Sequence, residues 1–292
     1  MHFVKAHGTG NDFVVLVDLD DELDLPASLV AAICDRHTGV GADGILRLLP
    51  GAGDAAVFMD YRNADGSVVE MCGNGVRVVA AHAIANHLVP DSASEFVVGT
   101  RAGDKPVHVT FTNDGHVDTV TVDMGRPTFD LDAVPFVPNG DPNELGQHTV
   151  ELEVGPIALI PVSMGNPHAV LAVEDVAEAP VRTLGPVLER HERFPEHTNV
   201  EFVRVTGSDR LELRVWERGV GETLSCGTGA CAAVAALQRA ELLGETVAVD
   251  VPGGTLTVTH RGGESAFLAG PVANVYSGTI GADWLLAHHA LR

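Results

Sequence analysis

The sequence predicts a two-domain α/β protein in which one fold occurs twice. Its 292 residues are enough chain for two domains, since a domain takes ~150 residues on average. Apolar and polar residues alternate with a period of two in 117–124 and 211–216, which indicates half-buried strands. Against this strand-rich background, 73–88 and 227–243 have the pattern of helices, one in each half of the chain.

The two helical segments are predicted to form the centres of the two domains. The first, from Gly73 to Leu88, carries apolar residues at the spacing of one helix face: Val76, Val79, Ala80, Ala83 and Ile84. The second, from Gly227 to Leu243, is apolar almost all round at its start, which is typical of a buried helix. We expect strands to wrap around each of them. The segment Pro26–Arg36 is predicted to be a third, amphipathic helix with proline near its first turn.

An internal repeat relates the two halves. Each central helix opens with the same pattern, Cys72–Gly75 (CGNG) and Cys226–Gly229 (CGTG), 154 positions apart. Two further matches lie upstream in the same order, each 155 positions apart: Tyr61–Asn63 with Trp216–Arg218, and Gly10–Val15 with Gly165–Val170. Three matches in one order at nearly one offset indicate two copies of a single fold.

The repeat also sets the expected domain boundaries. We place the first domain at 1–123 plus 271–292 and the second at 124–270, because the strand-like tail Val272–Thr279 can return to the first sheet. The predicted fold class is α/β (α+β), with two similar domains, each a mixed, curled β-sheet around a central helix. Duplicated halves are expected to face each other about a pseudo-two-fold axis, with the active site in the cleft between them.

Charge and composition exclude several functional classes. With 18 Lys and Arg against 40 Asp and Glu, the formal net charge is −22, which disfavours binding to nucleic-acid phosphates and to anionic membranes. No apolar run approaches the ~18 residues of a membrane span, and the N-terminus lacks the apolar core of a signal peptide. Four cysteines are too few for a disulfide scaffold. We therefore expect a soluble cytoplasmic protein with no nucleic-acid or membrane partner.

Cys72 and Cys226 are the candidate catalytic residues. A Cys-Gly-X-Gly pattern at a helix start leaves backbone N–H groups bare, and these donors can hold a carboxylate. The same donors and the helix dipole are expected to lower the thiol pKa from its ordinary value of ~8.5. Cys34 and Cys231, which lie outside the repeated pattern, are interpreted as packing residues.

Two such thiols suit the inversion of a stereocentre. If both flank one α-carbon, a thiolate removes the α-proton from one face while the opposite thiol delivers a proton to the other. This chemistry needs no metal and no pyridoxal phosphate. The only lysines, Lys5 and Lys105, do not lie beside a phosphate cradle, so neither is an obvious Schiff-base residue. The prediction is an enzyme without a cofactor.

Other interpretations of these motifs are weaker. Cys226 and Cys231 have poor spacing for zinc ligands, and a Cys-His hydrolase would leave the second Cys-Gly-X-Gly unexplained. The segment Gly39–Gly44 fits G-x-G-x-x-G but precedes a strand, so we interpret it as a turn. His168 stays open between a structural and a catalytic role. The asparagines in turn-like contexts stay open between backbone support and binding: Asn11, Asn63, Asn166 and Asn199.

The motifs together resemble the diaminopimelate epimerase family over nearly the whole chain. They are His7–Phe13, Gly41–Asp43, Asn63–Ser67, Cys72–Gly75, Met164–His168, Gly185–Pro186, His191–Pro195, Thr198–Val200, Glu217–Gly219, Cys226–Ala230 and Pro252–Gly254. The resemblance implies an isomerase that interconverts LL- and meso-2,6-diaminoheptanedioate on the route to lysine and peptidoglycan precursors. It implies no cofactor, a homodimer, and the two-domain fold described above.

The resemblance also implies roles for individual residues. Cys72 and Cys226 would be the base and acid pair, with assistance from His168 and Glu217. Substrate would be bound at the helix starts and by polar residues that contact its far end: Asn11, Asn63, Gly73, Asn74, Gly75, Asn166, Asn199, Glu217, Arg218, Gly227 and Thr228. Tyr276 occupies the place of an interface tyrosine in the family's dimers, and no metal ligands are implied.

The chain departs from the family pattern at two places. Many members have Gln where this chain has Gly44, so no side-chain contact is expected from that position. The C-terminal segment 282–292 extends beyond the usual end, with no assigned role. The alternative function is a proline racemase-like or other amino-acid racemase of the same fold, and a remoter one is a thiol hydrolase. A general racemase would not need Glu217, Arg218 and the asparagines for a distant ammonium and carboxylate.

Overall fold

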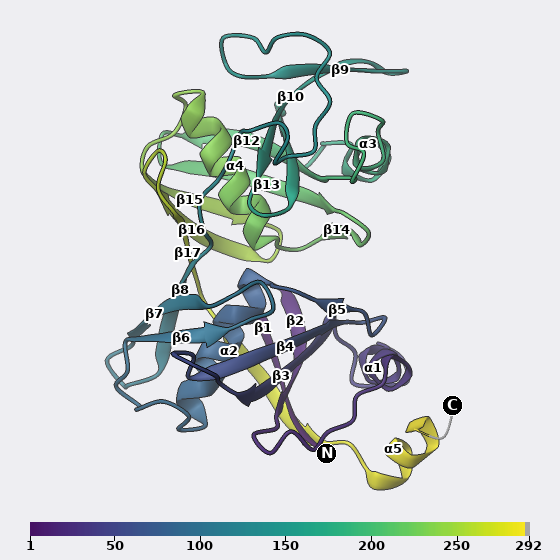
Figure 1. Ribbon diagram of the computed structural model, residues 1–292, viewed down its shortest axis with the longest axis vertical. Coiled ribbons are helices and arrows are strands. Elements are labelled where there is room, and N and C mark those ends of the chain that lie inside the picture. Colours follow the sequence, from purple (N-terminus) through teal and green to yellow (C-terminus); the bar gives the residue numbers. More distant parts are fainter. Residues whose placement is uncertain (290–292) are drawn as a thin grey trace. The chain divides into compact units, whose positions relative to one another are not determined.

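The computed structural model describes residues 1–289 and divides the chain into two compact units (Figure 1). Unit 1 consists of Met1–Val122 and the chain from Gly270 on, and unit 2 is Asp123–Ala269. The boundaries expected from the repeat differ from these by one residue at each junction. Within residues 1–289 no helix has both the length and the apolar character needed to cross a membrane.

Unit 1 is a mixed sheet. Its strands are β1 (His2–Gly8), β2 (Asn11–Val17), β3 (Gly44–Pro50), β4 (Val57–Asn63), β5 (Val68–Val69), β6 (Glu95–Gly99), β7 (Lys105–Phe111), β8 (Val117–Asp123) and β18 (Ala273–Thr279). The pairing order is β18, β1, β2, β3, β4, β6, β7, β8, with short β5 also on β4. Only β2–β3 and β4–β6 are parallel. The C-terminal strand thus returns to β1, as the tail pattern predicts.

Unit 2 repeats this order. Its strands are β9 (His148–Leu152), β10 (Gly155–Ser163), β11 (Pro167–Ala172), β12 (Asn199–Gly207), β13 (Arg210–Glu217), β14 (Gly221–Thr223), β15 (Thr246–Val251), β16 (Gly254–His260) and β17 (Ala266–Gly270). The order is β9, β10, β11, β12, β13, β15, β16, β17, with β14 on β13. The parallel pairs, β11–β12 and β13–β15, fall at the same places as in unit 1. The predicted duplicated fold is confirmed.

A helix packs inside each sheet. In unit 1, α2 (Gly73–Ala85) contacts β1, β2, β3, β4, β6 and β7, and in unit 2, α4 (Gly227–Arg239) contacts β10, β11, β12 and β16 (Figure 1). Both helices end earlier than predicted. Two residues after the end of each helix, His87 and Glu241 have φ values of 56° and 60°. These values lie in the left-handed region that commonly follows a helix C-terminus.

The remaining helices pack outside this arrangement. As predicted, α1 (Ala27–Cys34) follows a proline, Pro26, and it packs on β3 and on α5 (Ala282–His289). The helix α3 (Val181–Glu189) packs on β12, β13 and β14 and was not expected, because Gly185 and Pro186 lie inside it. Of the C-terminal extension, residues 290–292 lie outside the described residues.

Strand register corrects one of the three repeat matches. In unit 1 Leu46 lies opposite Tyr61, and in unit 2 Glu201 lies opposite Val215. Leu46 and Glu201 are 155 positions apart, whereas Tyr61 and Val215 are 154 apart. The predicted match of Tyr61–Asn63 with Trp216–Arg218 is therefore wrong by one residue. The structural counterpart of Glu217 is Asn63.

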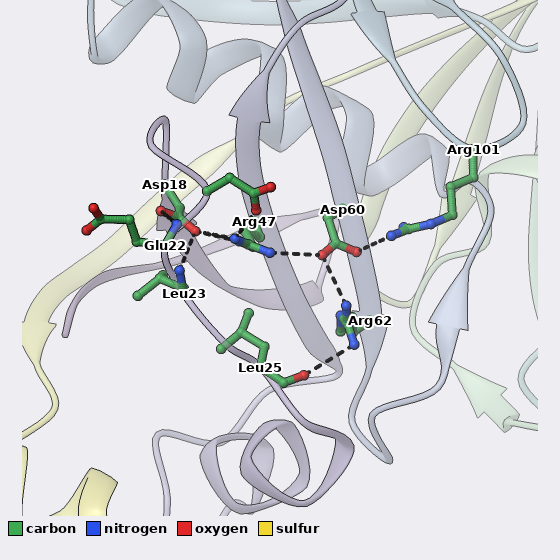
Figure 2. Close-up of polar contacts among 9 residues, drawn as sticks. Asp18, Glu22, Leu23, Leu25, Arg47, Asp60, Arg62 and Arg101 are labelled. Carbon is green, nitrogen blue, oxygen red and sulfur yellow. Dashed lines mark hydrogen bonds and ion pairs between the residues drawn. The ribbon is translucent and has the colours of Figure 1, made fainter. Parts of the chain in front are cut away.

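A buried network of charges fixes the strands of unit 1. Arg47 on β3 has 9% of its side chain exposed and donates to Asp18, with Nε 2.7 Å from Oδ2 (Figure 2). Asp60 on β4 is 2% exposed and accepts from Arg101, 2.7 Å away, and from Arg62, 3.4 Å away. The network connects β3 and β4 to the loop after β2 and to the turn after β6. It lies away from the cysteine motif and supports the fold.

Candidate active site

The first candidate half-site is built on the start of α2. Cys72 is the N-cap of that helix, and its Sγ accepts a hydrogen bond from the backbone N–H of Gly75, 3.4 Å away. The half-buried thiol in turn donates to Oδ1 of Asn11, 3.6 Å away, at the start of β2. A side chain at position 75 would press on Leu46, 3.0 Å from its Cδ2, so glycine lets the helix start pack on β3.

Two further residues orient the amides beside Cys72. Arg77, fully buried on α2, donates to Oδ1 of Asn74 over 2.6 Å, which leaves the Asn74 amide N–H to donate to Asn11 over 3.4 Å. On the other side, Asn11 donates through Nδ2 to Asp43, 2.9 Å away. Sequence reasoning missed Arg77 and treated Asp43 only as part of a turn. Both fix the direction of an amide rather than contacting the thiol.

Asn63 and Gly44 lie opposite each other on β4 and β3. Asn63 donates its side-chain amide to Ser67, 3.1 Å away, so in this structure it supports the turn after β4. A Cβ at Gly44 would lie 2.3 Å from the carbonyl oxygen of Arg62 and 2.6 Å from the ring of Tyr61. The absence of a side chain at position 44 allows β3 and β4 to approach this closely.

The second candidate half-site is built on the start of α4 in the same way. Cys226 is the N-cap, Gly229 donates its N–H to Sγ over 3.4 Å, and the Thr228 hydroxyl also lies 3.4 Å from Sγ. Burial raises the pKa of Cys226 well above its ordinary value, and the nearby carboxylates of Glu217 and Glu201 raise it further. The Thr228 hydroxyl and the Gly229 N–H at the helix start lower this pKa, as the sequence predicts, but burial and the two carboxylates outweigh them.

Glu217 lies at the end of β13, next to this thiol. Burial raises its pKa, and hydrogen bonds from Thr223 and Cys226 oppose that rise. Burial thus favours the protonated form of both Glu217 and Cys226, which contact each other within one unit.

His168 forms a buried pair that sequence reasoning missed. Its Nδ1 lies 2.6 Å from Oε1 of Glu201, and both side chains are 0% exposed. The other ring nitrogen, Nε2, lies 3.0 Å from Oδ1 of Asn166. Burial raises the pKa of Glu201, and His168 opposes the rise. The available signal was the repeat itself, because Glu201 stands where the first copy has the apolar Leu46.

Two of the predicted far-end residues, Asn199 and Arg218, lie beside one another in unit 2. Asn199 on β12 donates to the carbonyl of Pro167 over 2.9 Å and accepts from the backbone N–H of Arg218 over 3.0 Å. The exposed Arg218 side chain donates to the carbonyl of Glu196, 3.0 Å away. Arg218 and Glu217 bond to different partners, so they do not form an ion pair with each other.

The other predictions concern the interface, the metal and the remaining cysteines. Tyr276 on β18 is 48% exposed and packs edge-on against Phe3, with 5.9 Å between ring centroids. Among the described residues, no group of three His, Cys, Asp or Glu side chains is arranged to hold a metal ion. Cys34 and Cys231 are buried, and burial raises the pKa of Cys34 to about 12.

Comparisons with known proteins identify the family. The family model described as diaminopimelate epimerase matches residues 3–129 and 160–275. The chain is 41% identical to the diaminopimelate epimerase of Pelotomaculum thermopropionicum, over 95% of this chain and 98% of the relative. It is 43% identical to that of Thioalkalivibrio sulfidiphilus, over 96% and 99%. The chain belongs to the diaminopimelate epimerase family.

Solved structures of other isomerases share the fold. A hydroxyproline epimerase from Agrobacterium vitis, with bound trans-4-OH-L-proline, has a TM-score of 0.70 over 95% of this chain and 91% of its own, at 17% identity. A probable proline racemase from Agrobacterium radiobacter K84 has a TM-score of 0.69 at 16% identity, over 97% and 93%. At these identities the likeness shows the fold alone. Membership in the diaminopimelate epimerase family makes this chain an isomerase.

Proposed function

We propose that the protein interconverts LL-2,6-diaminoheptanedioate and meso-2,6-diaminoheptanedioate by moving the α-proton between Cys72 and Cys226. One observation carries the proposal. In this chain of the diaminopimelate epimerase family, a cysteine caps the central helix of each unit, and its Sγ accepts a hydrogen bond from the backbone N–H of the glycine three residues later.

The proposed reaction exchanges one proton for another at a single carbon. A thiolate on one side takes the α-proton, the electron pair of the C–H bond stays on the carbon, and the thiol on the other side gives its proton to the opposite face. The first cysteine is then a thiol and the second a thiolate. Because the surroundings of Cys226 favour its protonated form, we assign it the donor role in the free enzyme.

The helix starts are proposed to hold the carboxylate next to the reacting carbon. Backbone N–H groups at a helix N-terminus bind anions, and bound negative charge there is stabilised by the helix dipole. The binding residues would be Gly73, Asn74 and Gly75 in unit 1 and Gly227 and Thr228 in unit 2. Resonance of the α-carbanion with the carboxylate raises the negative charge on its oxygens, so the same donors also stabilise the transition state.

The other assigned residues would assist catalysis or bind the distal end. Glu217 and His168 would supply charge and protons beside Cys226. Arg218 would bind the distal carboxylate, for which a guanidinium offers a bidentate fork. The amides proposed to take the remaining polar groups are Asn11, Asn63, Asn166 and Asn199.

We also propose a homodimer formed through β18. Val275 and Tyr276 on that strand are 58% and 48% exposed, and exposed large apolar side chains next to each other are typical of an interface. Sedimentation of the parent protein and of Tyr276→Asp would test this. A dimer is expected for the parent and a monomer for the variant.

The substrate is tested with a panel of amino acids. Protein treated with EDTA and dialysed is incubated separately with LL-diaminopimelate, lysine, proline and hydroxyproline, and the stereoisomers are separated by chiral chromatography. Formation of the meso isomer alone supports the proposal. Activity that returns only with added metal or pyridoxal phosphate contradicts the mechanism. Inversion of proline or hydroxyproline instead would favour the racemase alternative that the shared fold suggests.

A further inference from the structure

His168 and Glu201 form a buried acid–base pair inside unit 2. Oε1 of Glu201 is 2.6 Å from Nδ1 of His168, and neither side chain is exposed. The second carboxylate oxygen, Oε2, is buried and has no hydrogen-bond partner. A buried carboxylate with an unpaired oxygen is costly, and an apolar residue of similar size would avoid that cost.

Unit 1 shows that the fold itself does not need this pair. The register of β2–β3 and β11–β12 puts Phe13 at the place of His168 and Leu46 at the place of Glu201. Both unit 1 residues are apolar and fully buried. The same strand pairing and the same helix start therefore form around apolar side chains. The pair in unit 2 serves something other than the backbone arrangement.

The start of α4 leaves room for Glu201. A Cβ at Gly229 would lie 2.9 Å from Oε1 of Glu201, so any larger residue at position 229 would disturb the carboxylate. Gly229 also donates its N–H to the Sγ of Cys226. Thus Gly229 has two roles: its backbone N–H contacts the thiol, and the absence of a side chain leaves space for the Glu201 carboxylate.

The surroundings of His168 define what the pair can do. The groups that interact with it are Glu201 from β12, Asn166 from the loop before β11 and Glu217 from β13. A carboxylate that accepts from Nδ1–H fixes the direction of the imidazole ring, and Oδ1 of Asn166 can accept from Nε2–H on the other side.

We propose that Glu201 is a positioning residue that holds the His168 ring by accepting from Nδ1–H, and that it thereby directs Nε2–H to donate to Oδ1 of Asn166 on the other side of the ring. The inference rests on the proposed function only for the role of His168 in turnover. The position of the ring and of its proton is independent of the substrate. Glu201 acts through His168 and need not touch substrate.

Two variants separate the charge of Glu201 from its hydrogen bond. Glu201→Gln keeps an oxygen that can accept from Nδ1–H but removes the negative charge. Glu201→Leu removes both and copies the residue of unit 1. Glu189→Gln is the matched control, because Glu189 is also a buried glutamate of unit 2 but bonds to Trp216 and the N–H of Gly219.

The direct readout is the proton NMR signal of His168 Nδ1–H in the free protein. A short hydrogen bond to a carboxylate shifts this signal strongly downfield and slows its exchange with water. We expect the signal in the parent and in Glu189→Gln, an upfield shift in Glu201→Gln, and loss by exchange in Glu201→Leu. His82, a buried histidine of unit 1 bonded to Asn274, serves as an internal reference that should not move.

Kinetics provide the second readout. Loss of an outer partner of a functional histidine typically costs ~10- to 100-fold, so Glu201→Leu should lower kcat by about that factor with little change in KM. Glu201→Gln should lie between it and the parent. If Glu201→Leu does not fold, Glu201→Gln carries both tests.

Two results would overturn the inference. One is a His168 signal in Glu201→Gln that is the same as in the parent. The other is a kcat in that variant equal to that of the parent. A parent protein that shows the NMR signal but does not epimerise diaminopimelate would instead refute the proposed function and leave the positioning role standing.

Discussion

The half-sites of unit 1 and unit 2 have the same backbone but different side chains around the thiol. In both, a cysteine N-cap accepts an N–H from a glycine three residues on, at 3.4 Å. Around Cys72 the corresponding strand positions hold Phe13 and Leu46, whereas around Cys226 they hold His168 and Glu201. The duplicated backbone supplies two helix starts capped by a cysteine, and carboxylates from neighbouring strands raise the pKa of Cys226.

The charges of unit 1 have a different use. Lys5, Asp12 and Arg36 form one cluster, and Arg47, Asp18 and Asp60 form another. These pairs connect strands and loops. In unit 2 the carboxylates of Glu217 and Glu201 lie close enough to Cys226 to raise the pKa of its thiol. The comparison shows that one backbone can surround the two thiols with different side chains.

The largest effect is expected from removing either thiol. Cys72→Ser and Cys226→Ser should each lower the interconversion rate by ~10³-fold or more, since each removes one of two proton-transfer groups. Rates are measured by chiral chromatography, with Cys34→Ser as the control. If one of the two variants keeps most of its activity, the half-sites do not act together.

The next effect concerns distal recognition, which we assign to unit 2. Arg218→Met should lower kcat/KM by about 3 kcal/mol or more, the scale for losing one partner of a charge pair that is buried once substrate is bound. The loss should appear in kcat as well as KM if binding there helps to position the reacting carbon. Lysine, which lacks the distal carboxylate, should be a very poor substrate of the parent. A near-normal rate for the variant, or efficient inversion of lysine, would refute the assignment.

A third prediction tests the electrostatic difference between the thiols. The carboxylate of Glu217 disfavours the Cys226 thiolate, so Glu217→Gln should lower the pKa of Cys226. Alkylation of Cys226 by iodoacetamide, followed by mass spectrometry across a pH series, should then begin at lower pH than in the parent. Cys72 is the control in the same samples, and its profile should stay unchanged. A profile of Cys226 that moves to higher pH would contradict the account.

The smallest effect concerns acid stability in unit 1. Burial would raise the pKa of Asp12, but hydrogen bonds from Arg36 and Lys5 outweigh it and hold the pKa well below the ordinary value. Bonds from Leu23, Glu22 and Arg47 similarly lower the pKa of Asp18. A lowered folded-state pKa contributes stability above the unfolded pKa of ~3.9, and this stability is lost as the pH falls below that value.

Denaturant titrations at several pH values check this. Between pH 5 and pH 3 the free energy of unfolding should fall in the parent and fall less steeply in Asp18→Asn. Asp132, which is exposed, provides a control in Asp132→Asn. Equal slopes for the parent and Asp18→Asn would show that the network does not contribute as described.

Much of the fold could be predicted because the sequence contains an internal repeat, so each half supports the interpretation of the other. The Cys-Gly-X-Gly pattern marks both helix starts, since glycines there free the backbone donors. The helix α3 could not be predicted, because Gly185 and Pro186 argue against a helix unless tertiary packing compensates. Gly185 allows that packing, since a Cβ there would lie 2.6 Å from the Trp216 ring. The one-residue slip between Asn63 and Glu217 also needs strand register to be seen.

The parts of the candidate site that depend on a short sequence pattern could be predicted. Both cysteines are helix caps, but the raised pKa of Cys226 depends on carboxylates from other strands. Glu201 gave no periodicity signal because residues 199–203 are all buried, so no exposed face contrasts with it. Only alignment of the two copies sets it against Leu46.

The most direct test of the two-thiol account is turnover of LL-diaminopimelate in D₂O at early times. If each thiol serves one face, the meso product takes its new α-hydrogen from a thiol that has exchanged with solvent. NMR should then find one deuterium at the inverted carbon of the product, while unreacted LL substrate keeps its hydrogen. Deuterium in the recovered LL substrate before product forms, or product without deuterium, would contradict the assignment of Cys72 and Cys226 to opposite faces.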